Sequence, residues 1–277
     1  MEATVLSIAG SDPTGGAGVQ ADIKAMTTIG VYAAAAVSCI TIQNSYGVSS
    51  VVPLAPDIVS KQIHAVLNDH NVTHIKIGMV GTIAVAEAIG AVLHDFQGEI
   101  VFDPILMSST GQNLFEPQAI QKLHETLFNK VTVLAPNLPE LSILAGEQKL
   151  VGYHDAVTAA KKLLTRHEKL RIIVVKGGHA GVNETITDTM VLKADGSYRE
   201  QSVSHLKIPT KNTHGTGCTF ASAYAAYHCL TGDDISSFFS AVEYVQNVLS
   251  LSSSALTVKN PEGQGVMLHY RVSSSGI

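Results

Sequence analysis

The feature of this sequence that most limits its fold is the alternation of apolar runs with amphipathic segments. The runs expected as strands are 4–9, 33–42, 74–80, 99–104, 131–135 and 171–176. The segments expected as helices between them are 20–29, 56–68, 85–94, 117–128, 139–145 and 153–167. Strands that are apolar along their whole length, with helices between them, indicate a mostly parallel sheet that is covered on both faces. We therefore predict an α/β fold with three layers, α/β/α.

The second half of the chain departs from this rhythm. Residues 187–192 and 197–205 alternate in the manner of strands around Asp195-Gly196, which predicts a hairpin. Two helices are expected after it, over 217–230 and 235–254. Since the sequence contains neither a linker-like segment nor an internal repeat, we predict a single domain over residues 1–277.

Unusual side chains follow the predicted strands. Right-handed crossovers bring the carboxyl ends of parallel strands to one edge of the sheet, where ligands bind in folds of this kind. The residues expected at that edge are Asp12, Gln43, Met79, Asp103, Asn137 and Lys176. The sequence therefore predicts a ligand site at this edge.

The stretch 212–228 combines a glycine turn with an Ala-rich segment. Gly215, Thr216 and Gly217 predict a turn that enters a helix. The first turn of a helix has unpartnered N–H groups and a partial positive charge, and glycine removes the Cβ atoms that would keep an anion away. Cys218 would lie at that helix entrance, where the dipole favours a thiolate. A plain turn before a buried helix, with Cys218 as a packing residue, accounts for the stretch equally well.

The first glycine-rich loop, 15–18, matches neither of the two common phosphate-binding patterns. A dinucleotide fold would also need an acidic residue after the second strand, where Gln43 and Asn44 stand instead. NAD binding is therefore disfavoured. Close approach of the backbone to a ligand and a simple tight turn both remain open for this loop.

Several of the candidate residues suit particular chemistry. The amide of Gln43 offers a donor and an acceptor to a heteroaromatic ring, and Met79 suits either a flat ring or the core. Asp103 and Glu140 suit Mg²⁺, which takes one or two carboxylates plus substrate phosphates, although both could be helix N-caps. Lys176, beside two glycines, is a plausible partner for phosphate.

Composition excludes several classes of protein. The chain of 277 residues is 45% hydrophobic and 15% charged, which allows a sizeable core. A net charge of −5, with no cluster of basic and aromatic residues, gives no reason to expect nucleic acid as a partner. The sequence shows neither a signal-peptide pattern nor an apolar run long enough for a bilayer, and its three cysteines suggest no disulfide framework. We expect a cytoplasmic protein with no membrane partner.

Six segments, in order, resemble the hydroxymethylpyrimidine and hydroxymethylpyrimidine-phosphate kinases of thiamine biosynthesis, which belong to the ribokinase-like superfamily. The segments are 9–22, 43–44, 76–79, 136–140, 176–179 and 211–218. The resemblance implies a central sheet flanked by helices, a small strand flap over the substrate, and a homodimer. Departures from the family pattern occur at 105–111 and 260–265, on the flank of the phosphate site.

The resemblance also implies roles for individual residues. A pyrimidine substrate would be bound by Asp22, Gln43, Met79 and Ala17, and ATP by Lys176 and Asn137. Mg²⁺ would be held by Asp103 and Glu140. The anion hole would be Gly215, Thr216 and Gly217, with Cys218 as the catalytic base.

We therefore expect an ATP- and Mg²⁺-dependent kinase for the hydroxymethyl group of 4-amino-5-hydroxymethyl-2-methylpyrimidine and for its monophosphate. A pyridoxal kinase is the alternative enzyme, because that branch shares the glycine turn and its cysteine, although Gln43 and Met79 favour the pyrimidine. A non-catalytic vitamin-binding protein on the same fold is a second alternative, and the intact set of charged residues with Cys218 speaks against it. A cysteine hydrolase is a third, for which His214 is the obvious local partner.

Overall fold

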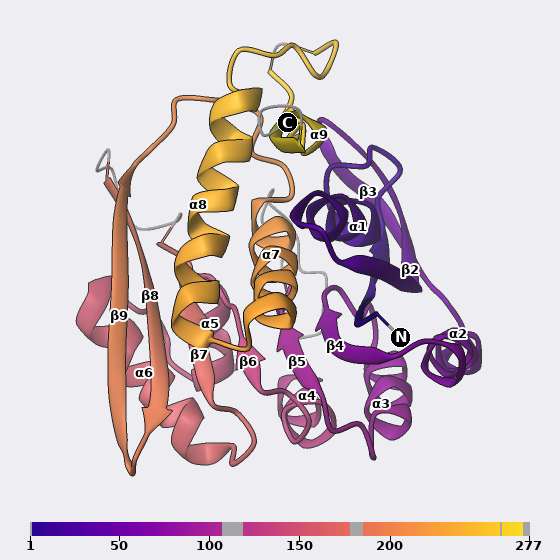
Figure 1. Ribbon diagram of the computed structural model, residues 1–277, viewed down its shortest axis with the longest axis vertical. Helices are drawn as coiled ribbons and strands as arrows, with labels where there is room; N and C mark the ends of the chain where they lie inside the picture. Colours follow the sequence, from indigo (N-terminus) through magenta and orange to yellow (C-terminus); the bar gives the residue numbers. More distant parts are fainter. Residues whose placement is uncertain (1, 107–118, 178–184, 261, 274–277) are drawn as a thin grey trace.

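The computed structural model describes residues 2–106, 119–177, 185–260 and 262–273 (Figure 1). Its described strands form one nine-stranded sheet in the order β3-β2-β1-β4-β5-β6-β7-β8-β9. The strands are β1 Thr4–Ser11, β2 Tyr32–Asn44, β3 Gly47–Pro53, β4 Val72–Ile77, β5 Glu99–Phe102, β6 Val133–Leu134, β7 Ile172–Val175, β8 Thr185–Ala194 and β9 Ser197–Leu206. From β2 to β7 in this order, neighbouring strands run parallel. The edge strand β3 is antiparallel to β2, and at the other edge β8 is antiparallel to β7 and β9 is antiparallel to β8. The predicted mostly parallel sheet is confirmed.

Helices cover both faces of the sheet, as predicted. They are α1 Gly18–Ile29, α2 Pro56–Asp69, α3 Ile83–Val92, α4 Ile120–Thr126, α5 Leu138–Ala145, α6 Gly152–Arg166, α7 Thr216–Thr231, α8 Asp234–Ser252 and α9 Tyr270–Ser273. One apolar core lies between the sheet and α2 to α6, and a second lies between the sheet and α1, α7 and α8. Figure 1 shows α7 and α8 side by side over the second face. No helix among the described residues has the length and apolar character needed to cross a membrane.

Helix α7 is buried on nearly all sides. The run from Cys218 to Ala226 lies in the core, where its small alanine side chains let α1 and α8 pack close to it. Gly215 precedes the helix in the left-handed region, at φ 85°. The first turn of α7 is therefore placed inside the molecule rather than at its surface.

The hairpin of β8 and β9 turns where the sequence predicts. Asp195 and Gly196 both have positive φ, 49° and 75°, as a two-residue hairpin turn of this hand requires. Ile186, Asp188 and His205 of this hairpin line the large cavity described below. The hairpin therefore forms one wall of that cavity.

Other expectations need correction. The run 33–42 is not a fully buried strand, because Ile40 is 47% exposed and Ile42 is 56% exposed. The end of this strand pairs with the edge strand β3 in a hairpin, and one side of that hairpin is uncovered. The sequence did not predict β3. The short helix α9 was missed as well. The first residues of the helix expected over 117–128 lie outside the described residues, and α4 is assigned from Ile120.

Candidate active site

A large cavity, with a volume of about 940 Å³, lies at the carboxyl ends of the parallel strands. All six residues expected at that edge line it, namely Asp12, Gln43, Met79, Asp103, Asn137 and Lys176. Cavities of this size are typical of small-molecule sites. The fold therefore brings these residues into one cavity, although in the sequence they are spread from Asp12 to Lys176.

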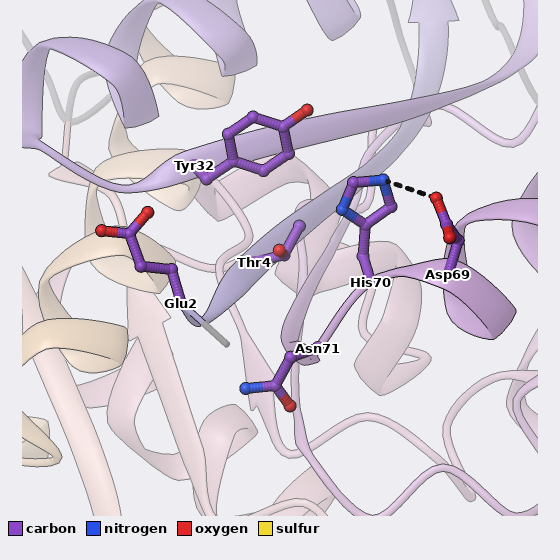
Figure 2. Close-up of a pocket in the computed structure, with 6 residues that line it drawn as sticks. All are labelled: Glu2, Thr4, Tyr32, Asp69, His70 and Asn71. Atoms are coloured by element: carbon purple, nitrogen blue, oxygen red, sulfur yellow. Dashed lines mark ion pairs between the residues drawn. The ribbon is translucent and has the colours of Figure 1, made fainter.

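A second, smaller pocket of about 200 Å³ lies where β1 and β2 begin, at the opposite edge of the sheet (Figure 2). There the ring of Tyr32 stacks on His70 with 5.5 Å between ring centroids, and His70 lies 3.6 Å from a carboxylate oxygen of Asp69. None of the predicted site residues lines this pocket. The chemistry expected from the sequence is therefore confined to the large cavity.

An ion pair lies directly under the glycine turn. The Nζ atom of Lys176 lies 2.6 Å from Oδ1 of Asp103, which is 2% exposed. A Cβ atom at Gly217 would lie 3.1 Å from that Nζ and 3.5 Å from Oδ2 of Asp103. Because Gly217 has no side chain, the first turn of α7 approaches the ion pair with its backbone, as an anion cradle requires.

Asn137 and Glu140 form a reciprocal cap at the start of α5. The Asn137 side chain accepts from the Glu140 N–H at 2.9 Å, and Glu140 accepts from the Asn137 N–H at 2.9 Å. Both residues also line the cavity. Burial, with the negative charge of Asp103, raises the pKa of Glu140 to about 7, against the opposing charge of Lys176. Glu140 therefore caps α5, and its ionised form is disfavoured because the charge of Lys176 does not fully offset burial and the charge of Asp103.

These carboxylates fit Mg²⁺ held largely by substrate. Asp103 and Glu140 line the same cavity, and both offer carboxylate oxygens, which Mg²⁺ prefers. Among the described residues there is no group of three His, Cys, Asp or Glu side chains that could hold a metal. One or two carboxylates plus phosphate oxygens and water is the usual coordination of Mg²⁺. The donor set therefore suits a metal that arrives with a phosphate ligand.

Cys218 lies in the first turn of α7, lines the cavity and is 5% exposed. Burial raises the pKa of its thiol to about 12; the Lys76 charge acts in the opposite sense, and the charges of Asp103 and Asp22 add to the rise. Desolvation at this position therefore acts against the helix dipole that was expected to favour a thiolate. The Nε2 atom of His214, the base that a cysteine hydrolase would need, is hydrogen-bonded to Oδ2 of Asp12 at 2.9 Å rather than to Cys218.

The residues expected around the substrate ring fall into two groups. Gln43, Met79 and Ala17 line the cavity, and Ala17 is also the N-cap of α1. Asp22 does not line it and is completely buried. Its oxygens accept from Lys76 at 2.8 and 2.9 Å and from two serines, Ser7 at 2.6 Å and Ser222 at 2.7 Å. Asp22 is therefore buried behind the residues that line the cavity and does not contact the space that a substrate would occupy.

Sequence reasoning did not assign a site role to Asp12. Its carboxylate accepts from the N–H groups of Thr14, Gly16 and Ala17 at 2.8, 3.0 and 2.8 Å, and from His214. Burial opposes its ionisation, but the hydrogen bonds from His214, Gln43 and Thr14 hold its pKa well below the usual range. The sequence placed it at the carboxyl edge of the sheet and before the glycine loop, but that position is equally typical of a turn. Asp188 and His205, paired at 3.2 Å on the hairpin wall, were missed too.

A parallel sheet whose carboxyl edge carries a buried helix start, a lysine–aspartate pair and a second carboxylate defines the class: a phosphate-binding α/β protein. The family model for phosphomethylpyrimidine kinase matches residues 12–264, and the chain belongs to this family. Its fold is that of the ribokinase-like vitamin kinases.

Individual relatives agree with this assignment. The hydroxymethylpyrimidine/phosphomethylpyrimidine kinase of Rhizobium meliloti is 37% identical over 231 residues, which cover 82% of each chain. The thiamine biosynthesis multifunctional protein of Corynebacterium efficiens is 35% identical over 222 residues, and this chain spans 29% of its length. The pyridoxal kinase of Staphylococcus aureus in complex with ADP superposes with a TM-score of 0.85 at 28% identity, covering 100% of this chain and 96% of that one. The phosphomethylpyrimidine kinase of Clostridium difficile superposes with a TM-score of 0.75 at 28% identity, covering 90% and 100%.

Proposed function

We propose that the protein transfers the γ-phosphoryl group of ATP to the hydroxymethyl group of 4-amino-5-hydroxymethyl-2-methylpyrimidine, and then to the phosphate of the product. The observation that carries this proposal is the continuity of one cavity, from Gln43 and Met79 to the Lys176–Asp103 pair under the glycine turn. A ring site and a phosphate site are thereby held within one enclosure. The family and the named activity of the Rhizobium meliloti relative support the same reaction.

Each part of the cavity has a place in this chemistry. Gln43 and Met79 would hold the pyrimidine, and Lys176 and Asn137 would bind the phosphates of ATP. Phosphoryl transfer needs mainly in-line positioning and stabilisation of charge on the transferred group. The N–H groups of the turn Gly215–Gly217 would hold the charge that grows in the transition state.

Asp103 and Glu140 would hold Mg²⁺, which neutralises phosphate charge when it is bound. Cys218 would take the proton of the attacking alcohol. Since burial raises its pKa to about 12, this role requires that the pKa fall when the substrates bind. A cytoplasmic location, which the composition led us to expect, and a homodimer, which the family resemblance implies, complete the proposal, and light scattering tests the dimer.

Phosphorylation of pyridoxal is the second candidate, because the Staphylococcus aureus pyridoxal kinase superposes closely with this chain. ATP consumption with hydroxymethylpyrimidine, its monophosphate and pyridoxal, measured side by side, tests both functions. We expect turnover with the first two compounds. Turnover with pyridoxal alone would replace the proposal by the second candidate. Tight binding with no turnover of any compound would indicate a non-catalytic vitamin-binding protein.

A further inference from the structure

Two glycine-containing segments of the cavity, the loop 15–18 after β1 and the turn Gly215–Gly217 before α7, contact each other directly. A Cβ atom at Gly215 would lie 1.8 Å from the backbone oxygen of Gly16, and one at Gly16 would lie 2.5 Å from the ring of His214. The loop after β1 and the turn before α7 therefore touch through backbone atoms. A side chain at Gly16 or Gly215 would therefore force the two loops apart.

Asp12 and His214 join these two loops. The Oδ2 atom of Asp12 accepts from Gly16 and Ala17 of its own loop and from Nε2 of His214, at 2.9 Å, next to the turn at Gly215. Asp12 is 2% exposed, and the side chain of His214 is 22% exposed. A buried ionised carboxylate is thus shared between the wall that would bind the ring and the turn that would bind phosphate.

The same carboxylate determines which end of the Gln43 amide is free. An ionised carboxylate only accepts hydrogen bonds, so His214 must carry its hydrogen on Nε2 in order to donate to Asp12. The Nε2 atom of Gln43 lies 3.4 Å from that nitrogen. Since both nitrogens then carry hydrogen, they are not hydrogen-bonded to each other, and the NH₂ group of Gln43 is directed instead toward the Asp12 carboxylate, whose pKa it helps to lower. The amide oxygen of Gln43 is then the end left to accept from a ligand. An exocyclic amino group is a ligand donor of the matching kind.

We propose that Asp12 and His214 are positioning residues, which orient the Gln43 amide as an acceptor for the amino group of an aminopyrimidine and hold the Gly215–Gly217 turn in register with it. This inference rests on the proposed function and deepens it, because it assigns the residues that would orient the contact with the substrate. Binding of the correct ring and placement of the transferred phosphate are then coupled through one hydrogen-bonded pair.

Two substitutions of His214 separate positioning from packing. In His214→Leu the donor to Asp12 is lost, and we expect kcat to fall about 10²-fold, the effect of a misplacement near 1 Å. In His214→Gln the side-chain amide can donate to Asp12, and we expect it to restore most of the wild-type kcat. In Asp12→Asn the acceptor is partly replaced by a donor, so the KM for the pyrimidine should rise as kcat falls. His70→Leu, which removes the His70–Asp69 contact of the opposite edge (Figure 2), is the matched control and should leave kcat unchanged.

Equal kcat in His214→Leu and His214→Gln would overturn the inference, as would wild-type kcat and KM in Asp12→Asn. A readout without catalysis is the ¹⁵N spectrum of the His214 ring in the wild-type protein, where we expect hydrogen on Nε2. A neutral ring with its hydrogen on Nδ1 would also overturn the inference. If the wild type phosphorylates none of the three compounds, the proposed function fails, and the ring spectrum still decides whether the pair is formed as inferred.

Discussion

Gln43 is the residue that should choose the substrate. It lines the cavity, and its amide can pair with a ring nitrogen or an amino group. Loss of hydrogen bonds to a buried ring costs about 1–3 kcal/mol. In Gln43→Ala we expect the KM for the pyrimidine to rise by about 5- to 150-fold at 1.4 kcal/mol per tenfold, while the KM for ATP stays near normal. Gln97→Ala, on the surface, is the control, and unchanged pyrimidine binding by calorimetry would remove Gln43 from the site.

Cys218 can be separated from a packing role by a change that alters its volume little. If Cys218 is a general base in the substrate complex, Cys218→Ser should lower kcat by about 10²–10⁴, the usual effect of losing such a group. The KM values and the melting temperature should change little. Cys229→Ser, near the other end of α7, is the matched control. Wild-type kcat with an unaltered pH profile would mean that the alcohol loses its proton to phosphate or water.

Which side chains reach the site could be predicted only in part. Residues at or just after the ends of apolar runs gave the six cavity residues, because parallel strands bring their carboxyl ends together. The partner of Asp22 could not be predicted, since Lys76 is 54 positions away and only the packing of α1 against the sheet brings the two together. The pKa of Cys218 could not be predicted either, because its burial depends on the placement of α7 between α1 and α8.

At the scale of elements, a stacked histidine pair joins α4 to the end of α6. The rings of His124 and His167 lie 5.0 Å apart and parallel within 1°, and Nδ1 of His124 lies 3.0 Å from Nε2 of His167. Burial lowers the pKa of both residues to about 4, with Arg166 adding to the effect on His124 and the charge of His124 adding to that on His167. Both residues are therefore neutral in the folded protein at pH 7.

This pair should make the fold sensitive to acid. An ordinary histidine has a pKa of 6.5, so the unfolded chain binds more protons than the folded one between pH 6.5 and about 4. The stability that the pair contributes is present above pH 6.5 and is lost as pH falls toward 4, at about 1.4 kcal/mol per pKa unit. In the double variant His124→Phe/His167→Phe, the loss of unfolding free energy between pH 7 and 4.5 should be smaller than in the wild type. His154→Gln, on the exposed side of α6, should keep the wild-type slope, and an equal slope in the double variant would contradict the assignment.

Element identity was predicted well where the apolar pattern is long. Helices α2 and α6 agree with their expected ranges within one residue at each end, because each has a continuous apolar face. Strand β3 was missed because its residues are mostly half-exposed or exposed, so they carry no apolar run. Its pairing with β2 is a property of the hairpin that no single segment shows.

For the whole molecule, the ion pair of Asp22 and Lys76 is a central junction. Both side chains are completely buried, and the pair joins α1 to β4 while Ser7 and Ser222 add β1 and α7. Removal of one partner of a buried pair leaves an uncompensated charge, at a cost of about 3–5 kcal/mol. We expect this loss of unfolding free energy in Asp22→Asn by urea titration, and partial recovery when Lys76→Met is added. Asp57→Asn, in an exposed pair that solvent screens, should change the unfolding free energy far less than Asp22→Asn. Additive losses in the double variant would show that the two buried charges do not compensate each other.

Metal removal should affect the reaction and not the fold. Because the described residues include no group of three side chains that could hold a metal, Mg²⁺ would depend on ATP for most of its coordination. We expect EDTA to abolish ATP consumption, with the melting temperature of the ligand-free protein unchanged. A lower melting temperature in EDTA would show a structural metal, and full turnover in EDTA would exclude the proposed role of Asp103 and Glu140.

The contact between Gly16 and Gly215 also has a consequence for synthesis of the protein. The carboxylate of Asp12 leaves the ribosome 202 positions before its partner His214. When residue 206 has emerged, every strand of the described sheet is already present, but the turn Gly215–Gly217 and the helices α7 and α8 are not. The strands of the sheet are therefore made before its second face can be covered and before the turn that would bind phosphate can close onto the first loop.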